Sequence, residues 1–442
     1  MSTTEAPPTA SGTDDADPVA AVTAWLEEQW DPDLTVAEWW ERLGTAGWSA
    51  PNLPVDRFGR GLSRSDATAV HRAISDFGAL GPPSGLGLLL AAPTIASHGT
   101  QEQVDTFVRD IVTGQQAWCQ LFSEPGAGSD LAGLSCRAER DGEEWIVNGQ
   151  KVWTSGGHMA DVGMLIARTN PSAPKHRGIS WMAIDMDQPG VEIRPLRELT
   201  GHALFNEVFL TDARVRADAL IGDENDGWRV ANTTLQNERA GLGAGGGGTA
   251  TSALPGSIAG QLDRRVGDLV GGAAPRRRQT GAARRSQSKM YAGLARSRNL
   301  GDDASIRQDL MRLHTLETIG AWNGARVKAA RAAGEDIAGM ANISKLMMSD
   351  VVRLSRDLGL RIVGAAGTLH AYTDEQRAAL DEATGDPMLA MVTGTALYAQ
   401  APPIYGGTDQ IQKNIIGERA LGLPKEPGDT RDIPFSDLPK NG

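Results

Sequence analysis

The sequence has few cysteines, no long apolar run and no excess of basic residues. Two cysteines among 442 residues, Cys119 and Cys136, make no disulfide framework, and no CxxC motif occurs. No stretch approaches the ~20 consecutive apolar residues of a membrane-spanning helix. The 43 basic residues are outnumbered by 55 acidic ones, and the net charge of −12 argues against general nucleic-acid binding. We therefore expect a cytoplasmic protein without a membrane span or a nucleic-acid partner.

Metal-binding and targeting motifs are also missing. The chain has no HExxH or Walker sequence, and its seven histidines are scattered, so we expect no metal site. His158 and His370 are interpreted as structural or surface residues. Residues 1–17 are acidic and rich in Pro, Thr and Ser, without the basic start and apolar core of a signal peptide. They predict a disordered leader.

The apolar pattern divides the rest of the chain into three regions and a tail. Residues 18–118 have helical spacing, residues 119–227 show short apolar runs separated by turn residues, and residues 228–423 have helical spacing again. Residues 424–442 are rich in Pro and Asp, and we expect them to be loosely held. Helices, then strands, then helices is not the alternation of a parallel α/β sheet. The pattern predicts an α+β protein with a β-domain between two helical domains.

Individual elements follow from the same patterns. Ser63 and Asp66, three positions apart, make a capping pair in front of a helical apolar stripe. Asn148-Gly149, between two apolar runs, predicts a tight hairpin. Further strands are expected at Val162–Ala167, Ile179–Ile184 and Val208–Leu210. A long C-terminal helix is expected from the stripe Ile306, Leu310, Leu313, Leu316 and Ile319.

Residues 241–289 fit none of these patterns, because glycine and arginine runs interrupt any continuous helix. The glycine run has a formal GxGxxG at Gly241, Gly243 and Gly246. It follows a helical stretch and lacks the βαβ setting of a dinucleotide site, so we interpret it as a flexible connection. The cluster Arg276–Arg278 is interpreted as an exposed loop rather than a phosphate site.

Two glycine-rich turns are candidates for ligand binding. In the first turn, Leu121–Asp130 (LFSEPGAGSD), Gly126 and Gly128 allow backbone amides to approach a ligand closely, and two serines add hydroxyls. In the second turn, Lys151–Gly157 (KVWTSGG), Trp153 stands two residues from a serine and could wall a planar heteroaromatic ring. Taken alone, each could be an ordinary turn, and Trp153 an ordinary core residue.

Together with IYGGTDQIQKNIIGERALGLP near the C-terminus, the two turns resemble the acyl-CoA dehydrogenases. The resemblance reaches from the N-terminal helices to about Pro424 and is weakest across Gly241–Asn299. It implies an N-terminal helical domain, a central antiparallel β-barrel-like domain and a C-terminal four-helix bundle, with FAD extended between the last two and reaching a neighbouring subunit. The implied activity is α,β-dehydrogenation of an acyl-CoA thioester, with electrons passed to an electron-transfer flavoprotein or another acceptor. A homodimer or homotetramer is the implied assembly.

The resemblance also implies roles for individual residues. Gly364-Ala-Ala-Gly367 is similar to the turn that covers the neighbouring subunit's FAD. Arg298, in Arg298-Asn-Leu-Gly301, keeps part of the family's arginine pattern, with Arg296 as the alternative. The full set implied for the cofactor is Leu121, Ser123, Gly128, Ser129, Trp153, Ser155, Arg298, Gly364, Gly367, Thr408 and Gln410. The set implied for the substrate is Ser129, Arg239 and Tyr405.

The reaction needs a carboxylate base near the thioester's α-carbon. Many family members place a glutamate directly after the tyrosine of the C-terminal motif, but this sequence has Gly406 there. A second family solution, a helical glutamate before an arginine, fits Glu238 and Arg239. Glu238 also shares one helical face with Ala231, Thr234, Leu235 and Leu242.

Alternatively, Glu238 could form a structural ion pair with an arginine or lysine. The flavin motifs and the missing side chain at Gly406 favour the role as base over this alternative. The Gly406 N–H could still polarise the thioester oxygen, and its missing side chain leaves room for a branched or bulky acyl group. Three other functions stay open: a flavin-dependent oxidase or monooxygenase on the same scaffold, a dehydrogenase of acyl-carrier-protein thioesters, and a binding homologue without catalysis.

Overall fold

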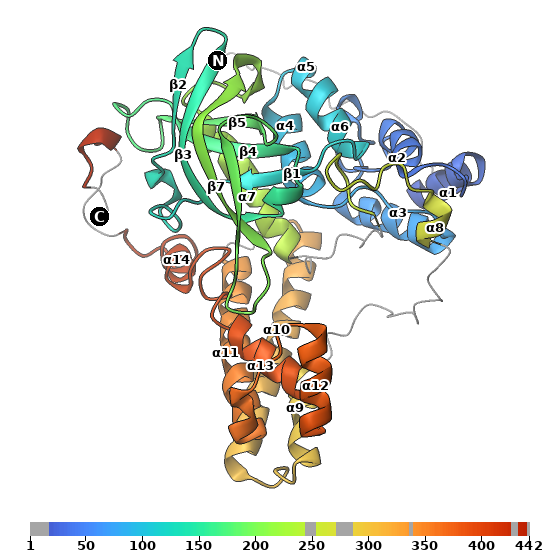
Figure 1. Ribbon diagram of the computed structural model, residues 1–442, viewed down its shortest axis with the longest axis vertical. Coiled ribbons are helices and arrows are strands. Elements are labelled where there is room, and N and C mark those ends of the chain that lie inside the picture. The colour runs from blue at the N-terminus through green and yellow to red at the C-terminus, as the bar shows by residue number, and fades with distance from the viewer. Residues whose placement is uncertain (1–16, 244–252, 271–285, 336–338, 426–431, 440–442) are drawn as a thin grey trace, which may run out of the picture. The chain divides into compact units, whose positions relative to one another are not determined.

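The computed structural model describes residues 17–243, 253–270, 286–335, 339–425 and 432–439 (Figure 1). The chain forms two compact units. The first contains residues 1–117 and 247–274, and the second contains residues 118–246 and 275–442.

The first unit is helical and has a core rich in tryptophan. Trp39, Trp40 and Trp48 are at most 2% exposed. The capping pair is confirmed, because the Ser63 hydroxyl accepts a hydrogen bond of 3.2 Å from the Asp66 N–H at the start of α3. The helices of this unit are α1 (Pro18–Gln29), α2 (Val36–Thr45), α3 (Arg64–Phe77), α4 (Ala92–His98), α5 (Gln101–Gln103), α6 (Arg109–Val112) and α8 (Val266–Val270).

Part of the stretch 228–423 belongs to this first unit. Ala253 and Val266 are fully buried in the core of the N-terminal helices. Four backbone hydrogen bonds join the segment to residues 32–37 at and before the start of α2, including Ala37 N–H to the Leu262 carbonyl at 2.9 Å and Val266 N–H to the Leu34 carbonyl at 2.9 Å. Periodicity could not reveal this, because it reports local structure and not the partner of a segment. Gly246 and Arg276–Arg278 lie outside the described residues.

The second unit begins with a sheet in the strand order β6-β7-β3-β2-β4-β5-β8, and β1 pairs with β4 in parallel. Most of the other pairs are antiparallel, as expected. All seven residues of β4 are buried, so this strand lies at the centre of the core. The strands are β1 (Trp118–Leu121), β2 (Arg137–Asp141), β3 (Glu144–Ser155), β4 (Val162–Arg168), β5 (Ile179–Asp185), β6 (Val191–Leu196), β7 (Phe205–Arg216) and β8 (Leu220–Ile221).

The predicted hairpin at Asn148-Gly149 is wrong. Strand β3 is 12 residues long and runs through Asn148-Gly149, with a bulge between Val147 and Gly149. A Cβ at Gly149 would lie 2.7 Å from the Cα of Cys136, so this glycine allows a close approach between chain segments rather than a turn. The chain reverses instead at Gly142, which has φ +61°, between β2 and β3.

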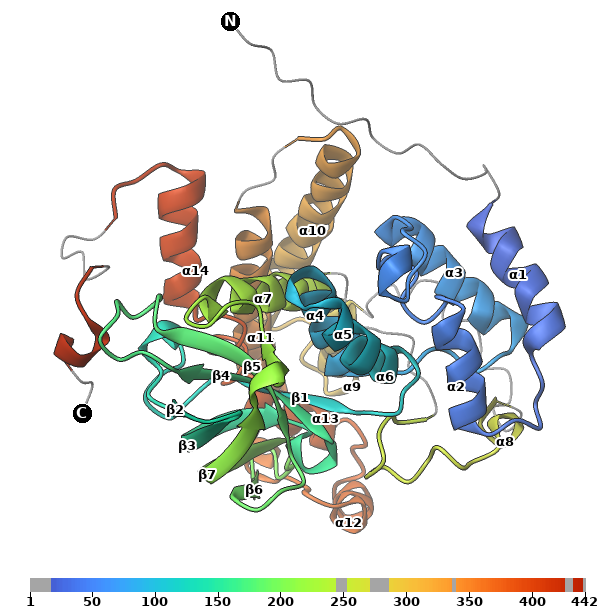
Figure 2. The ribbon, with the colours of Figure 1, turned by 90° about the horizontal axis from the view of Figure 1, so that it is seen from above.

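The C-terminal helices of the second unit pack around Tyr291, Leu313 and Leu358, which are at most 1% exposed. Helix α7 packs against β5, and α11 packs against α9, α10 and α13 (Figures 1 and 2). Ile306 and Leu313 of the predicted stripe are buried, whereas Ile319 at its far end is 38% exposed. The helices are α7 (Gly227–Gly243), α9 (Gln287–Ser297), α10 (Ala304–Ala332), α11 (Met340–Val363), α12 (Asp374–Thr384), α13 (Leu389–Tyr398) and α14 (Asp409–Ile415).

The expectation of a loosely held tail is wrong for residues 432–439. Phe435 N–H donates to the Ala173 carbonyl at 2.9 Å, and Ser436 N–H donates to the Pro171 carbonyl at 3.0 Å. The Phe435 ring also covers the guanidinium of Arg168, 3.8 Å from the ring centroid. Composition alone suggested a mobile segment, but backbone hydrogen bonds and one aromatic contact attach it to the β-domain.

Candidate active site

The first turn is held in place by a buried ion pair. Lys151 Nζ lies 2.8 Å from Glu124 Oε1, and the two side chains are 0% and 8% exposed. Nζ also donates to the Phe122 carbonyl at 3.1 Å. The Glu124 carboxylate accepts the backbone N–H groups of Ser135 at 2.7 Å and Cys136 at 2.9 Å. These bonds satisfy both buried charges and tie the start of the first turn to the backbone at Ser135 and Cys136.

The same contacts bring the two predicted turns together. Lys151 belongs to the second turn and Glu124 to the first, and Val152 N–H donates to the Ser123 carbonyl at 2.9 Å. A Cβ added at Gly128 would meet no atom within 4 Å, so the surface of the first turn is open at this point. Leu121, by contrast, is fully buried, so its assigned contact with the cofactor stays a prediction.

Trp153 has a conformation that packing alone does not explain. Its φ is +62°, a left-handed value that a bulky residue rarely adopts, and it lies at a register shift between β3 and β7. The indole is 56% exposed and meets the Phe205 ring edge-on, with 5.7 Å between centroids. The expectation that Trp153 could be an ordinary core residue is therefore wrong. Backbone strain that presents a large flat ring to solvent is typical of a ligand site.

The end of the second turn is open as well. Ser155 is exposed, Gly156 has φ +62°, and a Cβ at Gly156 would meet nothing within 4 Å. The turn is supported from behind by Asn206, whose amide donates to the Thr154 carbonyl at 3.0 Å and lies 3.3 Å from His158 Nδ1. His158 thus has a structural contact.

Glu238 lies on the face of α7 that the sequence indicated. Ala231 and Thr234 on this face are fully buried, and Glu238 is half-buried. The Gln120 amide Nε2 donates to Glu238 Oε2 at 3.5 Å. Because Gln120 is the residue before Leu121, this contact connects the carboxylate to the strand that enters the first turn. The Arg239 side chain lies outside the described residues, so the pair Glu238-Arg239 stays a prediction.

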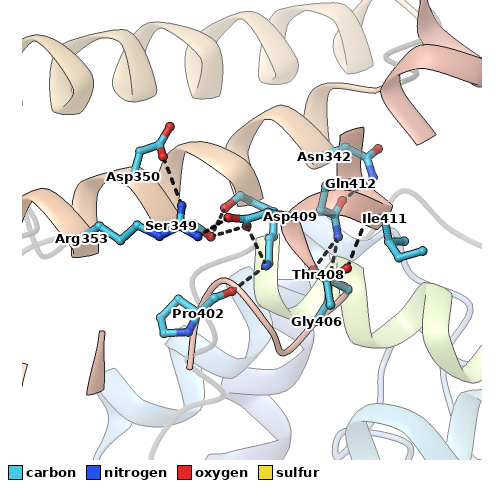
Figure 3. Close-up of polar contacts among 12 residues, drawn as sticks. Asn342, Ser349, Asp350, Arg353, Pro402, Gly406, Thr408, Asp409, Ile411 and Gln412 are labelled. Atoms are coloured by element: carbon cyan, nitrogen blue, oxygen red, sulfur yellow. Dashed lines mark hydrogen bonds and ion pairs between the residues drawn. The ribbon is translucent and has the colours of Figure 1, made fainter. Parts of the chain in front are cut away.

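The third motif forms a tight turn in front of α14 (Figure 3). Gly406 and Gly407 have φ values of +62° and +86°, which glycine adopts without strain. The Gln412 amide donates to both of their carbonyls, at 2.9 and 3.3 Å. Thr408 caps α14, with its hydroxyl accepting the Ile411 N–H at 3.2 Å. Gln410, two residues later, is exposed.

Asp409 ties this turn to α11. Its carboxylate accepts hydrogen bonds from the Ser349 hydroxyl at 2.8 Å and from Arg353 at 2.7 Å, and Lys345 Nζ lies 3.6 Å away (Figure 3). Burial acts to raise the pKa of Asp409, but the bonds from Ser349 and Arg353 and the nearby positive charges hold it below the ordinary value. Asp409 is therefore ionised at neutral pH and anchors the turn.

Tyr405 completes the turn on its N-terminal side. It is 37% exposed, and its hydroxyl lies 2.5 Å from that of Tyr398, which is 44% exposed. Burial and the hydrogen bond with Tyr398 raise the pKa of Tyr405, so the phenol stays neutral and can donate or accept a hydrogen bond.

The remaining cofactor candidates lie at the other end of α11. Arg298 donates to the Val363 carbonyl at 3.4 Å, directly before Gly364, and pairs with Asp386. Gly364 and Gly367 form the short helical turn that ends α11. The 15 positions from Ser349 to Gly364 correspond to about 22 Å of helix. One chain therefore presents two separate groups of candidate residues, one near Gly406 and one near Arg298.

Three residues important for this arrangement were missed at the sequence level. Gln120, Lys151 and Asp409 act through contacts with residues 118, 27 and 60 positions away, so no local pattern could reveal them. Lys151 is fully buried, and a buried lysine is rare without a partner, so its burial in the structure is what pointed to Glu124.

Two negative findings apply to the part of the chain that the structure describes. Within these ranges, no group of three or more His, Cys, Asp or Glu side chains could hold a metal ion. None of the described helices has the length and apolar character to cross a membrane.

Comparison with known families gives a match in each of the three regions. Residues 16–115 match the model "Acyl-CoA dehydrogenase, N-terminal domain", residues 119–213 the middle domain, and residues 278–421 the C-terminal domain. The chain belongs to the acyl-CoA dehydrogenase family. It is therefore an FAD-dependent acyl-CoA dehydrogenase with the three-part fold of that family. The segment that packs on the N-terminal helices lies between the last two matches.

Curated relatives and solved structures agree with this membership. Acyl-CoA dehydrogenase IpdE1 of Mycobacterium tuberculosis is 34% identical over 394 residues, 88% of each chain. Acyl-CoA dehydrogenase FadE34 of the same organism is 35% identical over 87% of this chain and 46% of its own length. The solved Tcur3481-Tcur3483 steroid ACAD has a TM-score of 0.63 at 23% identity, covering 92% of this chain and 97% of that one. The ChsE4-ChsE5 complex from M. tuberculosis has a TM-score of 0.61 at 24% identity, covering 95% and 100%. The acyl-CoA dehydrogenase fold thus extends over almost the whole chain.

Proposed function

We propose that Glu238 is the base that removes the α-proton of the acyl thioester. The observation that carries this proposal is the position of the carboxylate on α7, half-buried and bonded by Gln120 of the strand that enters the first turn. The usual position after Tyr405 holds Gly406 and has no side chain to accept a proton. A partly desolvated carboxylate is a stronger base than one in water.

The residues around the two turns fit FAD. A flat exposed indole at Trp153 and open space above Gly128 and Gly156 provide a wall and a cradle for a planar ring system with polar edges. Ser123, Ser129 and Ser155 supply hydroxyls there, and Thr408 and Gln410 supply polar groups from the C-terminal motif. When bound, the flavin accepts the β-hydrogen of the substrate as a hydride.

The thioester would lie between Glu238 and the Gly406 turn. The Gly406 N–H is assigned to polarise the carbonyl oxygen, and Ser129, Arg239 and Tyr405 to contact the substrate. A donor aimed at the developing oxyanion lowers the barrier to proton removal by ~2.7–4 kcal/mol in other enzymes.

We propose a branched or polycyclic acyl group as the substrate. The side chain missing at Gly406 leaves space that a glutamate would fill. One of the similar solved structures is described as a steroid ACAD, which supports a bulky acyl group. The thioester carrier is CoA in this proposal.

The assembly is proposed to be oligomeric, with electrons passed to an electron-transfer flavoprotein. Gly364 lies about 22 Å along α11 from Ser349, the residue that bonds Asp409 beside the Gly406 turn, and this separation suits contact of Arg298, Gly364 and Gly367 with a neighbouring subunit's FAD. The neighbour is a second copy in a homodimer or homotetramer, or a related chain, as in the ChsE4-ChsE5 complex. Native mass spectrometry of the purified protein separates these assemblies.

The deciding experiment is anaerobic mixing of the FAD-loaded protein with a panel of straight, branched and polycyclic acyl-CoA thioesters. Bleaching of the flavin absorbance by a bulky thioester is the expected result. Much faster reduction by a straight short-chain thioester would contradict the proposed acyl group. Reduction that requires NAD(P)H, with turnover that requires oxygen, would instead identify a monooxygenase.

A further inference from the structure

The buried side chain of Arg168 supports the residues directly behind the first turn. Its guanidinium donates to the carbonyls of Ala132 at 2.7 Å and Leu134 at 3.2 Å, and the other terminal nitrogen donates to the Lys175 carbonyl at 2.6 Å. The Arg168 backbone N–H also donates to the Cys136 carbonyl at 2.6 Å. One residue therefore holds the whole segment between the first turn and β2.

Lys175, in the loop between β4 and β5, contacts the first turn directly. Its Nζ lies 2.8 Å from both carboxylate oxygens of Asp130, the last residue of the first turn. The loop between β4 and β5 is thus connected to the first turn through Lys175 and Asp130, and to the segment directly behind the first turn through Arg168.

Arg168 is an unusual buried cation. The residue is 3% exposed, no carboxylate among the described residues forms an ion pair with it, and burial lowers its pKa to about 10. Backbone carbonyls satisfy its terminal nitrogens, and the face of the guanidinium is covered by Phe435. A desolvated cation over an aromatic face is stabilised more strongly than an exposed one. The tail therefore supplies the cover that this charge needs.

Two backbone hydrogen bonds position Phe435. The Phe435 and Ser436 N–H groups donate to the Ala173 and Pro171 carbonyls of the loop between β4 and β5, which places Pro434 opposite Pro174. Residues Phe435–Asp437 form a single 3₁₀ turn, whose first two N–H groups are free to bond the loop. These backbone hydrogen bonds therefore hold the Phe435 ring over the Arg168 guanidinium.

We propose that residues 432–439 act as a C-terminal clamp on the first turn, with Phe435 and Arg168 as positioning residues. Neither residue contacts substrate or cofactor. The clamp keeps the carbonyls of Ala132 and Leu134 fixed, so that the amides near Gly128 are already arranged before a ligand binds. Preorganisation of this kind raises affinity without adding a contact. The inference depends on the proposed function, in which the first turn binds the flavin and the thioester.

The test compares three variants of the FAD-loaded full-length protein by hydrogen exchange of the amides at 131–136. Phe435→Ala should speed exchange there by on the order of 10-fold, because the buried charge loses its aromatic cover. Phe435→Tyr keeps the ring and should restore slow exchange. Asp432→Ala changes an exposed residue of the same tail and should leave exchange unchanged. Unchanged exchange in Phe435→Ala would overturn the clamp.

Ligand binding then separates the clamp from the role of the turn. With Phe435→Ala, the Kd for FAD and the KM for the thioester should rise about 3- to 10-fold, while kcat changes much less. Faster exchange with unchanged Kd and KM would support the clamp as a structural device but overturn the assignment of the first turn to ligand binding. Deletion of residues 432–442 should reproduce Phe435→Ala, and wild-type exchange in that truncated chain would also overturn the clamp.

Discussion

At the scale of single residues, the proposed role of Glu238 as the base is the part of the mechanism that a substitution tests most directly. Glu238→Gln keeps the shape and the contact with Gln120 but removes the proton acceptor. We expect flavin reduction by the acyl-CoA to slow by on the order of 10²–10⁴, with FAD still bound. Stopped-flow absorbance under anaerobic conditions measures this directly. Glu27→Gln, an exposed glutamate on α1, is the control, and near-normal reduction in Glu238→Gln would move the base elsewhere.

Trp153 tests the cofactor site independently of the proton transfer. Trp153→Ala removes the exposed indole, and we expect the Kd for FAD to rise about 3- to 10-fold, from the ~0.5–1.5 kcal/mol of an aromatic pair. Trp153→Phe, which keeps a ring, should lose less. Equilibrium titration of the apoprotein with FAD gives both constants. Undisturbed FAD affinity in the alanine variant would count against the placement of the flavin beside this ring.

At the scale of elements, the contact between the first and second turns depends on the buried pair Lys151–Glu124. Lys151→Met leaves the Glu124 carboxylate buried without its cation, and we expect a loss of ~3–5 kcal/mol in the free energy of unfolding. Denaturant titration measures the loss. Lys175→Met is the matched control, because its partner Asp130 is 55% exposed and such a pair contributes ~1 kcal/mol or less. Equal losses in the two variants would refute the special role of the buried pair.

The attachment of α14 to α11 should depend on pH through Asp409. The pKa of Asp409 is lower in the folded protein than in the unfolded chain, so its stabilising contribution is present above the ordinary value of about 3.9. The contribution is lost as the pH falls through the lower folded-state pKa. We therefore expect Asp409→Asn to reduce stability at pH 7 and to lose part of the acid sensitivity below pH ~4.

Thermal unfolding from pH 3 to pH 7 checks the Asp409 prediction. Asp350→Asn is the control, because that carboxylate also pairs with Arg353 but is 64% exposed. A parallel shift of the wild-type and Asp409→Asn curves at every pH would show that Asp409 contributes nothing through its ionisation.

At the scale of the whole molecule, FAD should stabilise the protein by mass action. A ligand at 100 times its Kd adds ~2.7 kcal/mol to the free energy of unfolding. The melting temperature should therefore rise with FAD concentration, equally in the wild type and Glu238→Gln, and less in Trp153→Ala. Differential scanning calorimetry of the apoprotein with added FAD checks all three. A melting temperature independent of FAD would contradict binding to the native state.

The fold was predictable to a considerable extent from the order of apolar periods. Helices, strands and helices were expected, and the strands at Val162 and Ile179 and the cap at Ser63 are present. The hairpin predicted at Asn148-Gly149 is wrong, because an Asn-Gly pair between apolar runs occurs both in hairpin turns and in bulged strands. The expectation of a loosely held tail is wrong around Phe435, because a composition rich in Pro and Asp does not reveal the backbone hydrogen bonds that attach the segment.

The sequence by itself determined the family, the cofactor and the kind of reaction, because the motifs that carry the resemblance consist of particular residues at fixed local spacing. It also indicated Glu238 as the candidate base, through the resemblance to a second family arrangement with which the helical spacing agrees. The tertiary structure decided which distant residues support them: Gln120 beside Glu238, Lys151 under the first turn, and Phe435 over Arg168. Those contacts arise from chain segments up to 267 positions apart, and side-chain packing between distant segments leaves no signal in local spacing.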